Sequence, residues 1–475
     1  MPVGFFWRFV CLLPWLLAAG AAPAGSIYAG SPAQAQVERL VKPLVDGQCV
    51  VGVAVGVVDA DGTQVFGLGR TKLDGPAPDG NTVFEIGSIT KAFTGILLAD
   101  RVERGLVAYD DPVAKLLPDG ESPAMRVKVP TRNGKAITLA HLATHISGLP
   151  RMPSNFRPTD ARNPYIDYTV PLMYEFLTSH KLRRDPGAQY EYSNYGAGLL
   201  GHVLARKAGV GYEPLVIDRI CRPLGMADTC ITLSPRLKAR LATGHNVDGD
   251  AVANWDIPAL AGCGALRSTA KDMLKFLAAN MRLAASPLAG AMTASHSPRA
   301  KAGSDVSIGL GWHVWHSDGI VWHNGGTGGY ASFAGFVKAK RVGVVLLANT
   351  AAYGQVTAAG RLLLRALTGQ KAEPLKLRPV VRLTPEQLDA CVGRYAINDT
   401  LTLAVTRHDS RLRAQITGQP TVGIYPESPT RFFYKVAPAQ ITFTQGKQGR
   451  MASLIIHQGG ADTPAKRIAK EGPPR

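Results

Sequence analysis

The chain has 475 residues, of which 46% are hydrophobic and 19% are charged. This balance is typical of a packed globular protein and excludes a largely disordered one, and the length allows about two to three domains. The formal net charge of +18 favours anionic partners such as cell-envelope polymers, unless the basic surface has no binding role. A nucleic-acid partner is not expected, because the basic residues are scattered and form no long arm or stripe.

Residues 1–36 have the layout of a secretory signal peptide. Arg8 precedes an apolar run over residues 9–19, and small residues follow. Cleavage is expected after one of three alanines: Ala22, Ala24 or Ala35. An uncleaved anchor is the alternative, but the run is short and contains Pro14, and no later stretch approaches the length of a spanning helix. We therefore expect a mature protein that is periplasmic or secreted.

Residues 50–68 are expected to form a β-hairpin. An apolar run rich in valine over residues 50–58 reads as the first strand, Asp59-Ala60-Asp61-Gly62 as the turn, and residues 63–67 as the returning strand.

A serine and a lysine three residues apart stand at the expected start of the first long helix. Ser88 and Lys91 belong to the sequence Phe-Glu-Ile-Gly-Ser-Ile-Thr-Lys, and helical periodicity follows as far as Val102. Residues at i and i+3 share a helix face, so the amine can reach the hydroxyl. A neighbouring base activates a serine, and a lysine in a dry cleft has a lowered pKa. The pair predicts a serine hydrolase that forms an acyl-enzyme; the alternative is a serine cap followed by a surface lysine.

The same spacing recurs at Ser268 and Lys271, so the motif alone has low specificity. There Thr269 and Asp272 have the spacing of a capping box, and an amphipathic helix follows. We interpret Ser268 as a structural residue.

A second cluster contains Tyr192 and Asn194, just before a helix expected over residues 196–208. In an extended segment the two side chains project to the same side. A tyrosine near a cationic lysine can have a depressed pKa, so that it serves first as a general base and then as an acid. The alternative is an aromatic loop that only packs.

The third cluster is His323-Asn324-Gly325-Gly326, which follows directly on a strand and leads into a glycine-rich turn. Glycines allow close approach of a substrate, and exposed N–H groups there can stabilise an oxyanion. The segment lacks the lysine and the following helix of a phosphate-binding P-loop. A plain tight turn remains the other alternative.

Strands are expected around this turn and at residues 342–348, followed by a helix at 356–367. Strands at both ends with helices between them predict an α/β sandwich for residues 37–370. Prolines mark a linker over 371–387, and short alternating runs over 388–475 predict a small antiparallel β domain, barrel-like in form.

Five cysteines remain once the signal peptide is removed, and an odd number argues against a full disulfide framework. Cys221 and Cys230 flank a turn and could pair, a point that the sequence leaves open. The spacing of cysteine and histidine fits no zinc motif, so no metal site is expected.

The three clusters, in the order Ser-x-x-Lys, Tyr-x-Asn and glycine-rich triad, together resemble the penicillin-recognising serine hydrolases, and in particular the class C β-lactamase branch. That branch also holds DD-peptidases, D-aminopeptidases and esterases. Matching phrases lie between the clusters at 137–150, 222–229 and 264–270, and residues 127–150 are similar to the DD-carboxypeptidase/endopeptidase members. The C-terminal segment resembles a β domain appended to many members.

The resemblance implies a role for each residue of the three clusters. Ser88 would be the acylated nucleophile and Lys91 its activator. Tyr192 would protonate the leaving group and activate the deacylating water, while Asn194 orients the substrate. Backbone N–H groups of Ser88 and Gly326 would form the oxyanion hole. The implied fold is an antiparallel sheet with helices on both sides, and no metal or cofactor is required.

One departure from the family pattern concerns the substrate. Many members have Lys-Thr-Gly where this chain has His323-Asn324-Gly325, and that lysine helps to hold a substrate carboxylate. Histidine is largely neutral near pH 7, so the attraction weakens. We expect an amide substrate such as a D-amino-acid peptide of cell-wall type. The alternatives are a β-lactam, a carboxylic ester or a D-aminopeptidase substrate, and a non-catalytic module that binds penicillin or murein.

Overall fold

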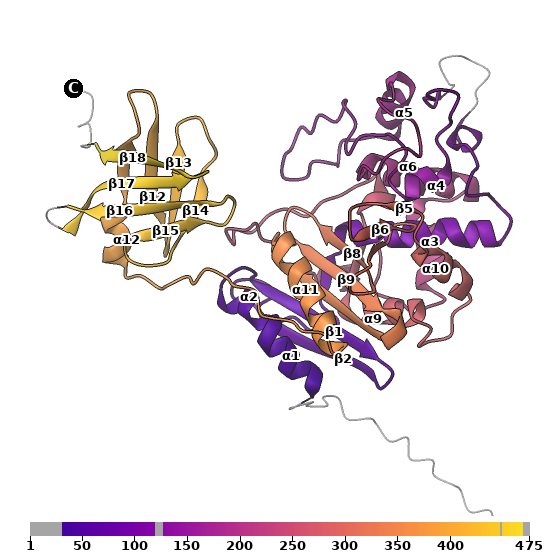
Figure 1. Ribbon diagram of the computed structural model, residues 1–475, viewed down its shortest axis with the longest axis horizontal. Coiled ribbons are helices and arrows are strands. Elements are labelled where there is room, and N and C mark those ends of the chain that lie inside the picture. Colours follow the sequence, from indigo (N-terminus) through magenta and orange to yellow (C-terminus); the bar gives the residue numbers. More distant parts are fainter. Residues whose placement is uncertain (1–30, 119–126, 447–448, 469–475) are drawn as a thin grey trace, which may run out of the picture.

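The computed structural model describes residues 31–118, 127–446 and 449–468. A large domain of mixed helices and strands comes first, and a β-barrel formed by the C-terminal part of the chain lies beside it (Figure 1). An extended segment joins the last helix of the large domain to the barrel. Within the described residues no helix is long and apolar enough to cross a membrane.

An eight-stranded antiparallel sheet forms the centre of the large domain, with strand order β2-β1-β10-β9-β8-β7-β6-β5. β1 lies between β2 and β10, with Val53 opposite Ala348, so the sheet joins the two ends of the domain as predicted. The strands are β1 (Gly52–Asp59), β2 (Gly62–Gly69), β5 (Ala300–Lys301), β6 (Val306–Ile308), β7 (His313–Trp315), β8 (Ile320–Gly326), β9 (Ala331–Val337) and β10 (Val342–Ala348).

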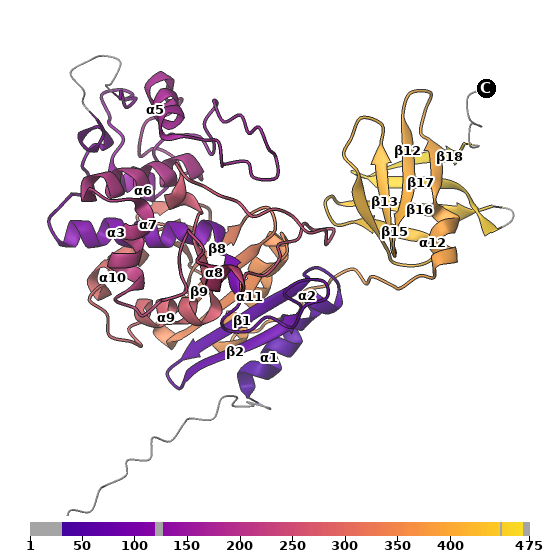
Figure 2. The same ribbon diagram turned by 180° about the vertical axis from the view of Figure 1, so that it is seen from behind.

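Helices cover both faces of this sheet, which confirms the predicted sandwich (Figure 2). Successive side chains of a strand point to opposite faces, so β1 contributes to two cores. Val53, Val55 and Val57 pack with α1 and α11, while Ala54 and Val58 face the larger core with α3, α6 and α9. The helices of the domain are α1 (Pro32–Leu40), α2 (Lys42–Asp46), α3 (Thr90–Glu103), α4 (Leu139–Ala143), α5 (Val170–Ser179), α6 (Asn194–Ala208), α7 (Tyr212–Val216), α8 (Pro235–Lys238), α9 (Ala270–Asn280), α10 (Ala289–His296) and α11 (Tyr353–Leu367).

A separate two-stranded sheet consists of β3 (Val83–Glu85) and β4 (Arg267–Thr269). The second Ser-x-x-Lys motif begins in β4 with Ser268 and ends in α9 with Lys271. Thr269 caps α9 by accepting a hydrogen bond from the backbone N–H of Asp272 (3.2 Å). Ser268 is fully buried in β4, where its hydroxyl pairs with that of Thr229 at 2.8 Å. Its structural role is therefore confirmed.

The C-terminal part of the chain is a closed barrel, which confirms the predicted small β domain. Helix α12 (Pro385–Cys391) precedes it, and a capping box between Thr384 and Gln387 starts that helix. β11 pairs with both β12 and β18, which closes the ring. The barrel strands are β11 (Gly393–Ala396), β12 (Thr402–His408), β13 (Arg411–Ile416), β14 (Val422–Pro426), β15 (Arg431–Tyr434), β16 (Ala439–Gln445), β17 (Met451–Gln458) and β18 (Ala461–Arg467).

The predicted signal peptide lies outside the described residues as far as residue 30, and so do its candidate cleavage sites at Ala22 and Ala24. The third candidate, Ala35, lies inside α1. Ser31 caps this helix by accepting a hydrogen bond from the backbone N–H of Gln34 (3.1 Å). Cleavage after Ala35 would therefore remove the capped first turn of a packed helix.

All five cysteines in the described part of the chain are free, including Cys221 and Cys230. Both of these side chains are buried. Burial raises the pKa of the two thiols, to about 12 for Cys221 and about 11 for Cys230. The thiols therefore stay protonated and act as packing groups.

Candidate active site

Ser88 stands on a tight turn between β3 and α3. It is the middle residue of a short 3-10 helix, η1 (Gly87–Ile89), that runs directly into α3. The residues on either side of Ser88 are buried, whereas Ser88 itself is partly exposed. A hydroxyl is thus held at the floor of a cleft by two elements fixed in the core.

Gly87 brings this turn against the end of β8. Its φ of +49° is in the left-handed region, and a Cβ atom there would lie 2.6 Å from the backbone nitrogen of Gly326. Glycine has no Cβ and adopts this conformation without strain. The turn of Ser88 and the backbone of Gly326 are therefore neighbours, as the predicted oxyanion hole requires.

Lys91 reaches back from the first turn of α3 to Ser88. Its Nζ lies 2.9 Å from Ser88 Oγ, 2.9 Å from Asn194 Oδ1 and 2.6 Å from the carbonyl oxygen of Cys263. Only 2% of the residue is exposed. Burial lowers the pKa of Lys91 to about 8, and the positive charge of Arg151 acts in the same direction. The amine can therefore exchange protons near neutral pH.

Tyr192 and Asn194 reach the same place from the start of α6. Ser193 between them has an extended conformation and caps the helix, with its hydroxyl accepting a hydrogen bond from the N–H of Gly196 at 2.8 Å. The centroid of the Tyr192 ring lies 4.7 Å from Lys91 Nζ. The structure thus brings these two residues together with Ser88 and Lys91.

The expected depression of the Tyr192 pKa is wrong for the free protein. Burial of the phenol raises its pKa well above the ordinary value, and a hydrogen bond with Ser88 and the charge of Arg151 offset only part of this effect. Removal of water penalises the phenolate more than the nearby cations stabilise it. Tyr192 is therefore a phenol that can donate a proton, and Lys91 is the stronger candidate for the base.

The third cluster lies within β8, which extends to Gly326 and leaves only residues 327–330 for the turn. Asn324, Gly325 and Gly326 line the cleft. The Asn324 amide donates a hydrogen bond to Thr357 of α11 at 2.9 Å. His323 is fully buried behind the cleft and does not line it. Of the predicted site residues, His323 and Lys91 do not line the cavity, but only Lys91 reaches Ser88 through a hydrogen bond.

Two buried histidines pack against Tyr192, and a third packs against one of them. The ring of His145 lies 4.6 Å and that of His323 6.3 Å from the tyrosine ring, and His313 lies 5.1 Å from His323. Burial lowers the pKa of all three, to about 4 for His313. They are neutral at pH 7, and within the described residues no His, Cys, Asp and Glu cluster is arranged to hold a metal ion.

The cavity over Ser88 has a volume of about 550 Å³. Arg151 carries the one formal charge among the described residues that line it. Its guanidinium carbon lies 5.1 Å from the centroid of the Tyr192 ring, and its side chain forms no hydrogen bond or ion pair within the described part of the chain. The cleft thus presents a free cation beside the proposed acid.

Sequence reasoning missed Arg151 and the aromatic wall of the cavity. The wall consists of Tyr165, Tyr190, Trp255, Trp322 and Tyr353. These residues come from loops, from β8 and from α11, and no periodicity connects them. The available signal for Arg151 was its position directly after the family-like phrase that ends at Pro150.

Two protein-family models match the chain. One, described as Beta-lactamase, matches residues 37–368, and the other, described as a domain of unknown function (DUF3471), matches residues 377–467.

Relatives of known function and a solved structure agree with the first match. The D-alanyl-D-alanine-carboxypeptidase/endopeptidase AmpH of Escherichia coli K12 is 31% identical, over 69% of this chain and 88% of that protein. Penicillin-binding protein 4* of Bacillus subtilis is 26% identical, over 82% of this chain and 88% of that protein. The crystal structure of a β-lactamase/D-alanine carboxypeptidase from Yersinia pestis complexed with citrate superimposes with a TM-score of 0.61 at 25% identity, covering 70% of this chain and 98% of that chain.

Proposed function

Because this chain belongs to the β-lactamase family of serine hydrolases, we propose that it cleaves an amide bond in a cell-wall type peptide ending in a D-amino acid, through an acyl-enzyme on Ser88. The observation that carries the proposal is the 2.9 Å hydrogen bond between Lys91 Nζ and Ser88 Oγ. A nucleophile and base within hydrogen-bonding reach, with the base held by a third group, are the signature of covalent catalysis. Asn194 is that third group.

In the acylation step the neutral amine of Lys91 takes the proton of Ser88 as Oγ attacks the substrate carbonyl. The developing oxyanion lies against the backbone N–H groups of Ser88 and Gly326. Tyr192 gives its phenolic proton to the leaving nitrogen, and the Lys91 ammonium then returns a proton to the phenolate. Water attacks the acyl-enzyme with Lys91 or Tyr192 as its base, and Ser88 regains its proton.

Arg151 gives this chemistry a preference for a substrate with a free carboxylate. A guanidinium binds a carboxylate with two parallel hydrogen bonds, and that of Arg151 has no partner of its own among the described residues. The cation that other family members place on the strand, as the lysine of Lys-Thr-Gly, would come here from Arg151, whose guanidinium lies over the Tyr192 ring. A peptide with a C-terminal D-amino acid supplies such a carboxylate.

A cell-wall substrate places the protein outside the cytoplasm, and the predicted signal peptide would provide its export. The net charge of +18 suits an envelope rich in anionic polymers.

A second candidate function is hydrolysis of a carboxylic ester or of a D-aminoacyl amide. It is favoured by His323, which stands where a lysine cation would be and is neutral because burial lowers its pKa. Under this alternative the aromatic wall would bind the acyl group and Arg151 would have no role in substrate binding.

The test of the proposed function is the intact mass of the mature protein after exposure to benzylpenicillin. We expect an adduct of one penicilloyl group per chain that is absent in Ser88→Ala. Ser268→Ala is the matched control, because it alters the other Ser-x-x-Lys motif and should still acylate. Consumption of the drug without an adduct would indicate a β-lactamase. Neither adduct nor consumption, together with turnover of a p-nitrophenyl ester, would replace the peptidase with the esterase.

A further inference from the structure

The barrel forms hydrogen bonds to a loop of the large domain that contains residues 248–250. Asp248 lies at the tip of this loop, where Oδ2 accepts a hydrogen bond from the backbone N–H of Gly423 (3.0 Å) and Oδ1 accepts one from the hydroxyl of Tyr425 (3.0 Å). Two residues further on, Asp250 forms an ion pair with Arg413 at 2.6 Å. These contacts fix the barrel against the large domain.

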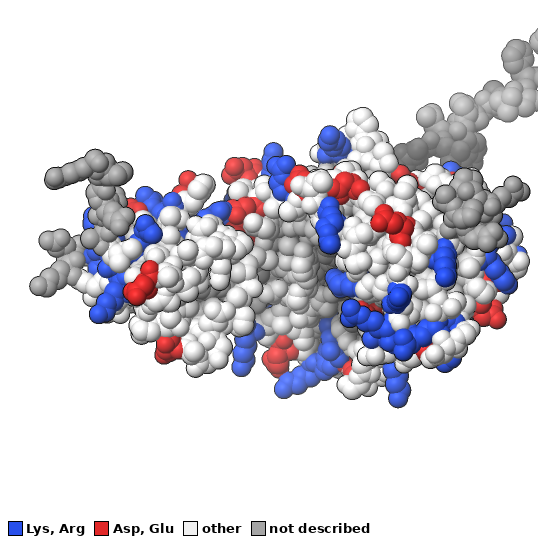
Figure 3. Space-filling model, turned by 90° about the horizontal axis from the view of Figure 1, so that it is seen from above, with Lys and Arg blue, Asp and Glu red and all other residues white. Residues whose placement is uncertain are grey.

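Beside this loop the two domains and the extended segment between them enclose a cavity of about 940 Å³. It shares no lining residue with the cavity over Ser88. On the face shown in Figure 3, the surface is hollowed between the barrel and the large domain, and basic side chains lie on both sides of the hollow. The volume lies within the range of small-molecule sites in proteins.

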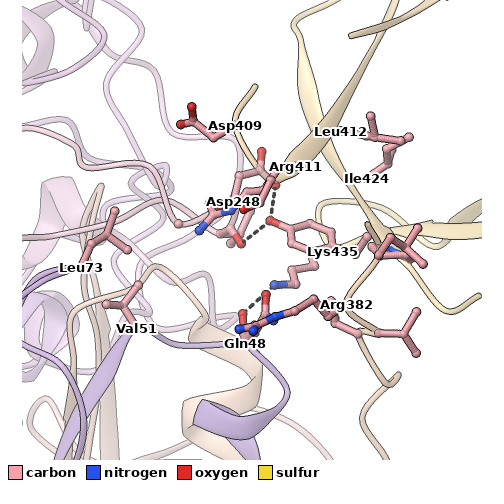
Figure 4. A pocket seen from close by; sticks show the side chains of 18 of the residues that line it. Gln48, Val51, Leu73, Asp248, Arg382, Asp409, Arg411, Leu412, Ile424 and Lys435 are labelled. Atoms are coloured by element: carbon pink, nitrogen blue, oxygen red, sulfur yellow. Dashed lines mark hydrogen bonds between the residues drawn. The ribbon is translucent and has the colours of Figure 1, made fainter. Parts of the chain in front are cut away.

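Cationic side chains outnumber acidic ones in the lining of this cavity (Figure 4). The cationic residues are Arg70, Arg382, Arg407, Arg411 and Lys435, and the acidic ones are Asp248 and Asp409. They come from the large domain, the extended segment and the barrel, so the assembled molecule alone brings them together.

The acidic residues offset the charge of these cations only in part. The Asp248 carboxylate is already bonded to Tyr425 and Gly423, and the side chain of Asp409 is 90% exposed. Arg407 forms its ion pair with Asp389, which does not line the cavity. The other four cations form no ion pair within the described residues: Arg70, Arg382, Arg411 and Lys435.

Backbone carbonyl groups hold three of these four cations in place, and Arg70 donates to that of Leu73 at 2.9 Å. Arg411 donates to the carbonyl oxygen of Asp248, and Lys435 donates to that of Gln48 at 2.6 Å. Lys435 also lies 3.7 Å from the centroid of the Tyr425 ring. Arg382 is exposed and has no hydrogen-bond partner among the described residues. The cationic side chains of Arg382, Arg411 and Lys435 thus line the same cavity from different parts of the chain.

The ammonium of Lys435 has no ion-pair partner among the described residues. Removal of water lowers its pKa to about 8 and the nearby charge of Arg411 acts in the same direction, while the charge of Asp248 offsets only part of this effect. A partly buried ammonium that has no ion-pair partner within the described part of the chain is costly, and an anion that enters regains charge-assisted hydrogen bonds.

We propose that the cavity between the two domains binds an anionic ligand, whose phosphate or carboxylate group is held by Arg382, Arg411 and Lys435. This site is independent of the proposed hydrolase activity. Phosphate groups would identify a sugar phosphate or a phosphodiester polymer as its source, and carboxylate groups an acidic peptide. The barrel would then supply half of a binding site that neither domain has alone.

The test is calorimetric titration of the full mature chain, in buffer of low ionic strength without phosphate, with glycerol 3-phosphate and separately with an N-acetylated peptide of two glutamates. We expect saturable binding of at least one probe at micromolar to millimolar concentration. The probe that binds identifies the source of the anion. Saturable binding of neither probe would overturn the proposal.

Four variants locate the bound anion. Lys435→Gln and Arg382→Gln should each weaken binding by about tenfold or more, the loss of one charge-assisted hydrogen bond. Arg394→Gln removes the same charge from an exposed position of the barrel outside the cavity, and Arg151→Gln removes it from the catalytic cleft. Both should bind as the parent does. Equal weakening in all four would mean general attraction to a basic protein and would overturn the site. Arg382 is exposed and unpartnered, so its variant tests the site even if Lys435→Gln does not fold.

Discussion

The guanidinium of Arg151 lies over the face of Tyr192, with 5.1 Å between its central carbon and the ring centroid. Tyr192 is the residue that would protonate the leaving group, and Arg151 is the one formally charged residue among the described residues lining the cavity. Under the proposed function, two adjacent side chains would therefore bind the charged end of the substrate and protonate its leaving group. Carboxylate recognition would then not depend on the position on β8 that His323 occupies.

Substitution of Arg151 should change substrate preference rather than abolish catalysis. We expect Arg151→Gln to lower kcat/KM for a peptide ending in D-Ala-D-Ala by about 10- to 100-fold, the value of one charge-assisted pair of hydrogen bonds. The same peptide with a C-terminal amide should be turned over slowly by both proteins and equally. Arg157→Gln, in the same loop but outside the cavity, is the matched control. An equal loss for both peptides would show that Arg151 positions Tyr192 instead.

Acylation should depend on the protonation of Lys91. Burial lowers the pKa of this amine to about 8, so the neutral base becomes the major form only above that pH. We expect the second-order rate of acylation by benzylpenicillin to rise about tenfold per pH unit below about pH 7 and to level off above about pH 9. Stopped reactions followed by intact mass would give the profile. A rate that falls or stays flat between these values would mean that Lys91 acts only as a cation.

The Lys91 assignment has its own control variant. Lys91→Arg keeps the charge but cannot lose a proton, so acylation should be lost across the whole pH range. The pKa shift also affects stability. The folded-state value lies below the ordinary value of 10.5, so between about pH 8 and 10.5 the unfolded chain binds the extra proton. Over that window the contribution of Lys91 to the free energy of unfolding should rise with pH.

A methyl group at Gly87 should damage the site more than the fold. Gly87→Ala forces a left-handed φ on alanine and drives its Cβ against the backbone of Gly326. We expect acylation to slow by about 100-fold, as displacements of about 1 Å in active sites do. Gly354→Ala, where a Cβ meets nothing within 4 Å, should leave acylation unchanged. Wild-type acylation by Gly87→Ala would remove the close approach from the explanation of the site.

The buried ion pair between Glu85 and Arg267 should be a large contributor to stability. Their side chains are 3% and 6% exposed and lie 3.2 Å apart. Arg267→Met would leave the Glu85 carboxylate buried without its cation, which costs about 3–5 kcal/mol. Asp256→Asn removes the half-exposed second partner of Arg267 and should cost less than about 1 kcal/mol. Urea denaturation measures both, and a loss below about 1 kcal/mol for Arg267→Met would contradict this account.

Local patterns predicted most of the elements and the close approach of Lys91 to Ser88. The valine-rich run of β1, the tight turn after it and the Ser88–Lys91 spacing all depend on neighbours in sequence. Trp255 shows why the cavity wall could not be predicted. The position of Trp255 in the wall depends on its backbone N–H, which donates a hydrogen bond to Glu85 at 3.0 Å. No sequence pattern predicts a contact between residues so far apart in the chain.

Charge balance is the other quantity that the sequence could not supply. The nearby lysine suggested a depressed pKa for Tyr192, yet burial dominates and raises it. The extent of desolvation depends on the loops that close over the ring, including the segment that carries Arg151. For the same reason the position of His323 behind the cleft, rather than at its surface, became visible only in three dimensions.

The pairing of β1 with β10 also bears on how the protein is made. Val53 leaves the ribosome early, but its strand partner Ala348 is synthesised only when the large domain is almost complete. Pairing across such a sequence separation is slow, because a long loop must close first. A nascent chain therefore carries Ser88 and Lys91 long before it has a sheet to hold Gly326 beside them. Acyl transfer should begin only when the last strand of the domain is in place, so an unfinished chain has no working nucleophile.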